Sequence, residues 1–426
     1  MITVLCLLRP VRVLAVGIAM AATLTACSAS NPVDQPGRSS AQVPAFDPPV
    51  AFGPTAAVLS PRNGPLPIVQ LLDGQVGWAA APDGLTRVDL ASATVGSSAA
   101  PTGEGLRQGQ VSVGAPVMAG VGDRRLAIAA FPVVLTEAGA AARQPAAELV
   151  AADAASGERL FTLTIPFAEW APASWTDTTV VGVGNNPARA VVTVRGVADS
   201  GALQQASFGV DLGRREILWN APGLAIDAVV GDVAVGTVTE GTATTVRAVG
   251  IADGATRWTD PDGGPVYQAG EGLVAVSGKI FHFLTTAEGR RVEYVERTRL
   301  ALDETVRFTC HYDERATTVC SRPTAAGGQY VVAFDSTSAS PLWRSPGGPG
   351  DRSPSTITAV WHGALYGTTP NGPVVLDART GAERNSAPGV APLLVSAYYG
   401  IGSGLRAGSG AGDAFQSVMH AHAATG

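Results

Sequence analysis

The stretch VVLDARTGAER, Val374–Arg384, has close copies at other places in the chain. They are LVAADAASGERLF at Leu149–Phe161, FGVDLGRREILW at Phe208–Trp219 and VVAFDSTSASPLW at Val331–Trp343. Most copies share a template in which apolar residues lead to an Asp, a Gly or small residue follows four positions later, and an aromatic residue stands eight positions after the Asp. Such an internal repeat takes precedence over other sequence signals because it decides the architecture.

Seven units align in one register when Asp377 and Gly381 serve as the reference. The Asp position is filled by Asp89, Asp153, Asp211, Gly250, Thr285, Asp335 and Asp377. The position four later holds Ala93, Gly157, Arg215, Gly254, Gly289, Ala339 and Gly381, and the position eight later holds Ser97, Phe161, Trp219, Trp258, Glu293, Trp343 and Asn385. From Asp89 to Asp377 is 288 residues in six intervals, a mean of 48 residues, which suits one four-stranded propeller blade.

Each position of the template has a physical purpose. Apolar residues with period two before the Asp, as in Val374, Val375 and Leu376, predict a buried strand. The Asp can accept backbone N–H bonds in a tight turn, and a Gly supplies positive φ without a Cβ clash. The aromatic residue falls on the outer strand, where it can pack against the neighbouring blade. We predict an all-β fold, a β-propeller of seven four-stranded blades, with six or eight as alternatives because the intervals vary from 35 to 64 residues.

The template resembles the tryptophan-docking repeat of the pyrroloquinoline-quinone-like propellers, which has Asp, Gly four positions later and Trp eight positions later. The resemblance covers most of the chain from about residue 55 to residue 400. It marks these structural docking positions: Asp153, Gly157, Asp211, Trp219, Gly254, Trp258, Asp335, Trp343, Asp377 and Gly381. The family includes quinone-dependent dehydrogenases, sensor domains and non-catalytic envelope lipoproteins, among them the propeller subunit of the outer-membrane barrel-assembly machinery.

The enzymes of that family resemble one another in a vicinal Cys-Cys disulfide beside the quinone and in Glu, Asn and Asp ligands to a calcium or lanthanide ion. This chain has no adjacent cysteines and no Cys-x-x-Cys-His haem motif, and its docking repeat is incomplete. We therefore expect no cofactor, no metal and no catalytic residues. A divergent quinoprotein or a hydrolase remains an alternative, because catalytic residues need not be adjacent in sequence.

The N-terminus reads as a bacterial lipoprotein signal, residues 1–26. Arg9 and Arg12 precede an apolar stretch, Val13–Leu24, that is too short to span a bilayer comfortably. The following Leu24-Thr25-Ala26-Cys27 resembles the lipobox, which implies that Cys27 receives a diacylglycerol and becomes the first residue after cleavage. The alternatives are an ordinary signal peptide with a chance Cys and an uncleaved anchor. The resemblance implies a lipid-anchored protein on the extracytoplasmic face of the cell membrane.

The rest of the chain divides into a tether and one folded domain. Residues 27–50 are rich in Ser, Pro, Gln and Asn and predict a disordered tether after the lipidated Cys27. Residues 51–410 predict the propeller, and residues 411–426 predict a tail or a ring-closing strand. We expect ring closure to join a strand near Ala391–Gly402 to N-terminal strands around AAVLSPRNGPLPIVQLL, residues 56–72.

Charge and composition exclude one class of partner and suggest a host. The net charge of −6 becomes about −8 once Arg9 and Arg12 leave with the signal, and nucleic-acid binders carry basic patches instead. Lys279 is the only lysine among many arginines, a bias typical of GC-rich genomes such as those of actinobacteria. The barrel-assembly role would not transfer to such a host, because it belongs to a different envelope.

Two cysteines remain for the folded domain, Cys310 and Cys320. In an exported protein they predict a disulfide that closes the loop CHYDERATTVC, with a stabilisation of about 2 to 3 kcal/mol in the chain-entropy model. Two free thiols, or a metal site shared with His311, are the alternatives.

Other polar motifs favour structural interpretations. His420 and His422 would share one face of a strand, which could seat a metal, but no ligand at suitable spacing accompanies them. TDPDGGP, Thr259–Pro265, lacks the later acidic ligands of a calcium loop and predicts an interblade turn. The run GIGSGLRAGSGAG, residues 400–412, predicts a flexible linker.

Four tryptophans lie outside the docking position: Trp78, Trp170, Trp175 and Trp361. Trp170 and Trp175 flank an interblade connection and predict either packing or an exposed contact patch. We interpret the whole chain as a non-catalytic propeller scaffold for interactions with envelope proteins. A binding protein for a sugar or cofactor is the first alternative, and it would need a concave pocket with convergent aromatic and polar groups.

Overall fold

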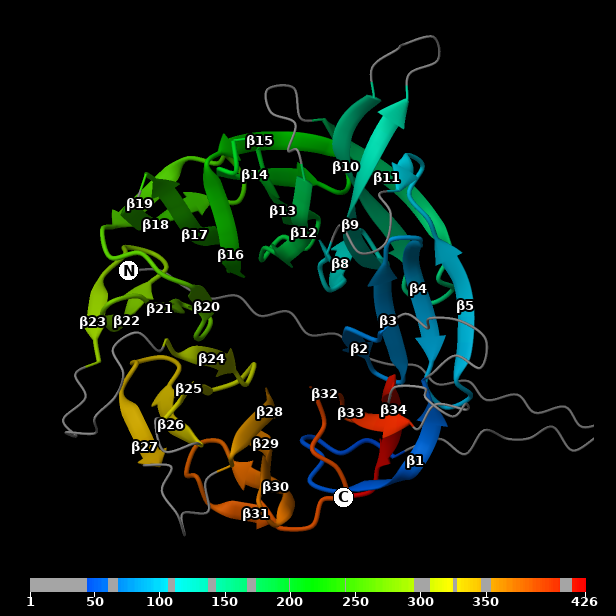
Figure 1. The fold of residues 1–426 in the computed structure, drawn as a ribbon, viewed down its shortest axis with the longest axis vertical. Coiled ribbons are helices and arrows are strands. Elements are labelled where there is room, and N and C mark those ends of the chain that lie inside the picture. The colour runs from blue at the N-terminus through cyan, green and yellow to red at the C-terminus, as the bar shows by residue number, and fades with distance from the viewer. Residues whose placement is uncertain are drawn as a thin grey trace, which may run out of the picture. The chain divides into compact units, whose positions relative to one another are not determined.

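The structure is a computed structural model. It describes residues 44–59, 68–105, 112–136, 143–166, 174–198, 200–241, 243–294, 307–324, 328–345, 354–406 and 416–426, all within one compact unit, Val43–Gly426. These residues form a β-propeller of eight sheets around a centre (Figure 1). Each blade contacts the next around that centre, so the ring is continuous.

We number the blades in chain order and the strands of each blade from the centre outward. Blade 1 is β2 (Leu71–Asp73), β3 (Val76–Ala81), β4 (Gly84–Asp89) and β5 (Thr94–Ala99). Blade 2 is β8 (Val117–Val121), β9 (Arg124–Thr136), β10 (Arg143–Asp153) and β11 (Arg159–Pro166), with β6 (Glu104–Gly105) also beside β9. Blade 3 is β12 (Ser174–Val183), β13 (Arg189–Val197), β14 (Leu203–Asp211) and β15 (Glu216–Pro222), with β7 (Ser112–Val113) parallel to β12. Blade 4 is β16 (Leu224–Val230), β17 (Val233–Glu240), β18 (Ala243–Gly250) and β19 (Thr256–Asp260).

The other four blades follow the same plan. Blade 5 is β20 (Val266–Gln268), β21 (Leu273–Ser277), β22 (Phe281–Thr285) and β23 (Arg291–Glu293). Blade 6 is β24 (Thr309–Tyr312), β25 (Thr317–Pro323), β26 (Gln329–Asp335) and β27 (Pro341–Ser345). Blade 7 is β28 (Thr356–Trp361), β29 (Ala364–Thr369), β30 (Gly372–Asp377) and β31 (Glu383–Asn385). Blade 8 is β32 (Leu394–Val395), β33 (Tyr399–Arg406), β34 (Gln416–Ala424) and, as its outer strand, the N-terminal β1 (Phe52–Val58).

The prediction of a four-stranded propeller is confirmed, but the preferred number of seven blades is wrong: there are eight. The repeat marks the turn between the third and fourth strands of a blade. In blade 8 the third strand, β34, is the end of the chain and the fourth strand, β1, is its beginning. A ring closed in this way has one such turn fewer than it has blades, so seven aligned turns correspond to eight blades.

Ring closure also differs from the expected pairing. The N-terminal strand β1 pairs with β34, with Val58 opposite His420 and Thr55 opposite His422. The predicted closing segment near Ala391–Gly402 contributes β32 and the start of β33 to the same sheet but does not touch β1 in register. Residues 44–50, predicted as the end of the tether, are hydrogen-bonded to the ring instead.

The docking turns share one backbone geometry. At the position four residues after the Asp position, all seven units have positive φ, whether or not the residue is Gly: Ala93 54°, Gly157 80°, Arg215 58°, Gly254 66°, Gly289 67°, Ala339 57° and Gly381 72°. In the turn of blade 7, the Gly381 N–H donates to the Asp377 carbonyl at 2.8 Å, and Asp377 Oδ1 accepts the N–H groups of Arg379 and Thr380. The Asp side chain therefore caps the turn, as the sequence reasoning requires.

The residue after the Asp position links three parts of the propeller. In blade 7 the Ala378 N–H donates to the Gly363 carbonyl in the first turn of the same blade, at 2.9 Å. The Ala378 carbonyl accepts the indole N–H of Trp343 from blade 6 at 2.8 Å. Trp219 and Trp258 make the equivalent bonds to Ile251 and Thr286 of the following blade. Each docking Trp thus fastens one blade to the next.

The end of β30 is apolar without alternation because neighbouring blades cover both of its faces. Val374, Val375 and Leu376 are all buried, at 5%, 0% and 3% exposure. The expected period of two is therefore absent from this strand.

Gly254→Ala should test the contact between blades. Gly254 has a φ of 66°, and a Cβ there would lie 2.7 Å from Trp219 Cγ. Gly122 has nearly the same φ, 62°, with nothing within 4 Å of its Cβ position, so Gly122→Ala is a matched control. We expect both variants to lose about 1 to 2 kcal/mol from the left-handed backbone, and Gly254→Ala to lose about 1 to 3 kcal/mol more from crowding. Urea unfolding measures both, and equal losses would contradict docking of the Trp on the Gly.

Acid should weaken the docking turns. The Ser156 backbone N–H lowers the pKa of Asp153. Burial raises the pKa of Asp335, but hydrogen bonds from the N–H groups of Ser338 and Thr337 and from the side chains of Arg379 and Ser338 together lower it overall. A folded-state pKa below the unfolded value of 3.8 stabilises the fold above that pH, and the stabilisation is lost as the pH falls through the folded-state pKa.

We therefore expect the free energy of unfolding to fall more steeply below pH 3.8 in the wild type than in an Asp153→Asn/Asp335→Asn variant. Urea unfolding on both sides of that pH measures the slopes. An Asp123→Asn/Asp232→Asn variant, altered outside the docking turns, serves as the control. Equal slopes in the wild type and the docking-turn variant would contradict this account.

Candidate functional site

The candidate site is the mouth of the central channel on one face of the ring. In an antiparallel blade, the turn between the first two strands and the docking turn lie at the same edge. We call this side the turn face. Figure 1 shows the first strands β2, β8, β12, β16, β20, β24, β28 and β32 around the centre. The ends of these strands, and the first turns that follow them, therefore surround the channel mouth.

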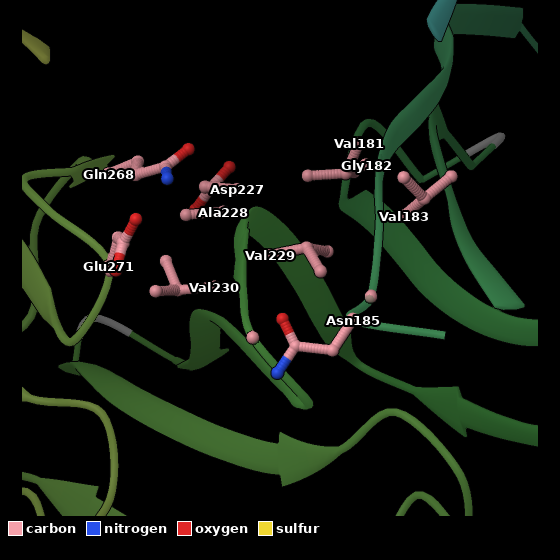
Figure 2. Close-up of a pocket in the computed structure, with 12 residues that line it drawn as sticks. Val181, Gly182, Val183, Asn185, Asp227, Ala228, Val229, Val230, Gln268 and Glu271 are labelled. Carbon is pink, nitrogen blue, oxygen red and sulfur yellow. The ribbon is translucent and has the colours of Figure 1, made fainter. Parts of the chain in front are cut away.

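Cavity 1 lies at this mouth between blades 3, 4 and 5. It has a volume of about 590 Å³ and is formed by the ends of β12, β16 and β20 (Figure 2). Its wall is made of Val181–Asn185, Asp227–Gly231, Gln268 and Glu271. Most of the lining residues are valines and glycines, and polar residues from three blades lie among them.

The polar groups of cavity 1 are of two kinds. Asp227 is held by Arg195, which lies behind the lining residues and also binds Asp177 at 3.1 Å. Burial raises the pKa of Asp227 and Asp177 adds to this effect, while Arg195 opposes it. The side chains of Glu271, Gln268 and Asn185 have no hydrogen-bond partner among the described residues, so they are available to a bound molecule (Figure 2).

Cavity 2 lies across the mouth, between blades 6, 7, 8, 1 and 2. Its volume is about 510 Å³. Its wall is made of Gln70–Gly74, Arg125, His311, Glu314, Thr358–His362 and Leu393–Tyr398. Unlike cavity 1, it contains aromatic side chains, Trp361 and Tyr398, beside charged and imidazole groups. It is thus a concave pocket with aromatic and polar groups together.

His362 is the most constrained side chain of cavity 2. Its Nδ1 lies 2.5 Å from Asp47 Oδ1, and its Nε2 lies 3.5 Å from Glu314 Oε2. Its ring stacks on Trp361 with centroids 3.8 Å apart and an interplanar angle of 12°. Because an acid faces each ring nitrogen, no hydroxyl nucleophile occupies the position that a catalytic triad requires among these described residues.

The remaining ionisable groups of cavity 2 are paired or neutral. Arg125 binds Asp73 at 2.8 Å. The imidazole of His311 is reached by solvent from the channel, but the surrounding wall removes part of its hydration and lowers its pKa. His311 is therefore neutral at pH 7.

The segment before β1 is fastened at the same mouth. The Phe46 N–H donates to the Ala397 carbonyl at 2.8 Å, and the Tyr366 hydroxyl donates to the Pro49 carbonyl at 2.7 Å. Asp47 accepts from Arg315 as well as His362. The chain therefore enters the ring on the turn face, next to cavity 2.

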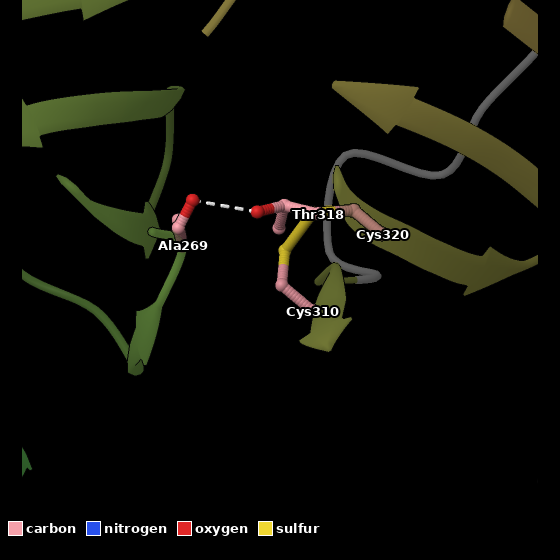
Figure 3. Close-up of a disulfide and its surroundings, with 4 residues drawn as sticks. All are labelled: Ala269, Cys310, Thr318 and Cys320. Atoms are coloured by element: carbon pink, nitrogen blue, oxygen red, sulfur yellow. Dashed lines mark hydrogen bonds between the residues drawn. A yellow bond between two sulfur atoms is a disulfide. The ribbon is translucent and has the colours of Figure 1, made fainter. Parts of the chain in front are cut away.

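The predicted disulfide between Cys310 and Cys320 is present, and it joins β24 to β25 in blade 6 (Figure 3). Both cysteines are buried, at 6% and 0% exposure. The adjacent Thr318 hydroxyl donates to the Ala269 carbonyl of blade 5 at 2.6 Å. The bridge therefore stiffens a blade behind the wall of cavity 2.

The other residues singled out in the sequence lie either outside the described part of the chain or at positions that stabilise the fold. Cys27 and Trp170 lie outside the described residues, as does the side chain of Trp175. The docking residues lie in or beside the outer turns and away from both cavities. They are Asp153, Gly157, Asp211, Trp219, Gly254, Trp258, Asp335, Trp343, Asp377 and Gly381. The part of the chain that the structure describes contains no group of three or more residues suited to a metal ion and no apolar helix of membrane-spanning length.

The start of the glycine-rich run is a strand rather than the predicted linker. Residues 400–406 belong to β33. A Cβ at Gly400 would lie 2.7 Å from Phe52 Cε1, and one at Gly404 would lie 2.9 Å from His420 Nε2. Glycine is needed there because aromatic rings cover the strand. His420 and His422 share a face, with ring centroids 6.2 Å apart.

Sequence reasoning missed both cavities. Their residues lie at the ends of the first strands and in the turns that follow, which carry turn signals such as Asp73-Gly74, Gly231-Asp232 and His362-Gly363. These signals could have placed the first turns. They could not have brought Asp47 to His362 across 315 residues.

Comparison with known proteins gives likenesses of fold. No protein-family model and no curated protein sequence matches the chain. Among solved structures, BamB from Moraxella catarrhalis is 16% identical with a TM-score of 0.38, over 65% of this chain and 76% of that one. The quinohemoprotein alcohol dehydrogenase ADHIIG from Pseudomonas putida is 11% identical with a TM-score of 0.47, and the match covers 89% of this chain and 75% of that one. An uncharacterised Listeria monocytogenes protein is 12% identical with a TM-score of 0.38, and the match covers 79% of this chain and 94% of that one. None of these likenesses assigns an activity to this chain.

The disulfide should be worth a measurable part of the stability. It links residues 10 apart, and closing so short a loop stabilises by about 2 to 3 kcal/mol in the chain-entropy model. We expect a Cys310→Ser/Cys320→Ser variant to lose that amount in urea unfolding. Wild-type stability in the variant would contradict this role.

Proposed function

We propose that this protein is a lipid-anchored, extracytoplasmic propeller that holds a protein partner of the cell envelope at the mouth of its channel, without catalysing a reaction. The lipid anchor at Cys27 rests on the lipobox resemblance. The partner site rests on the turn face. The chain enters the ring at that face, so the proposed tether begins there.

The rigidity of the turn face supports binding. In six of the seven blades with a docking turn, the N–H of the residue after the Asp position donates to the first turn of its own blade, as Ile251 does to Asp232 at 3.0 Å and Thr286 does to Gly272 at 3.0 Å. In blade 2 the acceptor is Arg125, at the start of β9. The first turns are therefore fixed before a partner arrives. A preorganised surface lowers the entropy cost of association.

The observation that carries the proposal is the set of unpaired polar side chains in cavity 1. Asn185, Gln268 and Glu271 come from three blades and have no hydrogen-bond partner among the described residues. The Asp227 carboxylate is already bound by Arg195, so we assign it a structural role in the wall and not a role as an acid or base. Such an array suits a polar or cationic segment of a partner protein.

The test is affinity purification from the native membrane after mild crosslinking. We expect the full lipoprotein to recover a consistent set of envelope proteins, and a Cys27→Ala variant to lose them because it is no longer anchored. A Gln268→Ala/Glu271→Ala variant should recover at least about tenfold less, the effect of losing contacts at the centre of an interface.

Glu240→Ala provides the matched control. Glu240 is exposed and ends β17, at the edge of blade 4 opposite the turn face, so its loss should leave recovery unchanged. Recovery that does not depend on Cys27 would contradict the anchored scaffold. Recovery that falls with Glu240→Ala but not with the cavity variant would contradict the partner site.

A further inference from the structure

We propose that cavity 2 binds a neutral, polyhydroxylated small molecule of the size of a mono- or disaccharide. This site is separate from the partner site in cavity 1 and does not depend on it. The volume of about 510 Å³ lies within the range of roughly 300 to 1,000 Å³ that is typical of small-molecule sites.

Two aromatic side chains give the cavity a surface for stacking. Trp361 ends β28 of blade 7, and Tyr398 lies in the first turn of blade 8. Both residues line the cavity and are only partly buried. The stacked His362, which Asp47 and Glu314 hold, fixes the Trp361 ring in place. The C–H face of a sugar ring packs well on such fixed aromatic faces, because the ring quadrupole is negative.

Polar groups of the same wall can bind hydroxyl groups. The Tyr398 hydroxyl and the His311 imidazole have no hydrogen-bond partner among the described residues. Gln70 uses its Oε1 to accept the Ala80 N–H at 2.7 Å, and its amide nitrogen remains available as a donor. A neutral imidazole and a phenol each both donate and accept, as sugar hydroxyls do.

The charges of the wall argue for a neutral ligand. In the wall, Arg125 is paired with Asp73. Arg315, next to the wall residue Glu314, is paired with Asp47. Glu314 faces His362, with Oε2 3.5 Å from Nε2. A wall whose charges are already paired offers little to an ionic ligand, which would have to be desolvated without compensation.

The experiment uses the full chain in detergent and saturation-transfer NMR with maltose, cellobiose and sucrose, followed by calorimetry for any sugar that binds. Glucuronic acid and glucosamine serve as charged counterparts. We expect at least one neutral sugar to bind, and the charged sugars to bind at least about tenfold more weakly. Tyr398→Phe and His311→Gln should each weaken binding by about 3- to 10-fold, the effect of one hydrogen bond.

Trp361→Leu should weaken binding by about tenfold through the lost stacking, whereas Gln268→Ala in cavity 1 should leave it unchanged. Thermal unfolding checks that each variant is folded. If Trp361→Leu fails to fold, Tyr398→Phe and His311→Gln still decide the question. Three results would each overturn the proposal: no neutral sugar binds at millimolar concentration, binding is indifferent to Tyr398→Phe and His311→Gln, or a charged sugar binds as well as a neutral one.

Discussion

The pairing of β1 with β34 is the constraint on which the rest of the molecule depends. It supplies the outer strand of blade 8 and joins the first described strand of the chain to the last. Without it blade 8 would keep only three strands. The same pairing places residues 44–51 on the turn face, where the Val50 N–H donates to the Gly426 carbonyl at 2.6 Å and Asp47 reaches His362. The strand pairing that closes the ring therefore also positions Asp47, which holds His362 in the wall of cavity 2.

The docking turns extend that order around the ring. Each turn is capped internally and bonded to the first turn of its blade or, in blade 2, to Arg125 at the start of β9, and three of them also receive a Trp from the preceding blade. The outer repeat thus fixes the inner turns that form the channel mouth. Residues that directly follow the Asp position of the repeat, such as Ile251 and Ala378, hold the candidate site without entering it. The buried disulfide Cys310–Cys320 contributes similar support within blade 6.

The sequence could predict features that repeat locally, and it failed where distant segments meet. The register of the seven turns and the disulfide follow from short-range patterns, and even Arg215 adopts the positive φ that its position requires. The eighth blade has no docking turn, so counting turns gave seven. Gly400 and Gly404 looked like a linker because the rings of Phe52 and His420 that cover them come from elsewhere in the chain. The cavities depend on side chains from several blades, which no local pattern records.

The central claim is that the turn face, and not the opposite face, meets a protein partner. The most direct test is photo-crosslinking in native membranes from a photoreactive amino acid placed at one exposed position at a time. Asn186 and Asp232 sample the turn face, and Ser200 and Lys279 sample the opposite edges of blades 3 and 5. The account predicts that Asn186 and Asp232 crosslink to the same envelope protein while Ser200 and Lys279 do not. Crosslinks to a partner from Ser200 or Lys279 alone would contradict it.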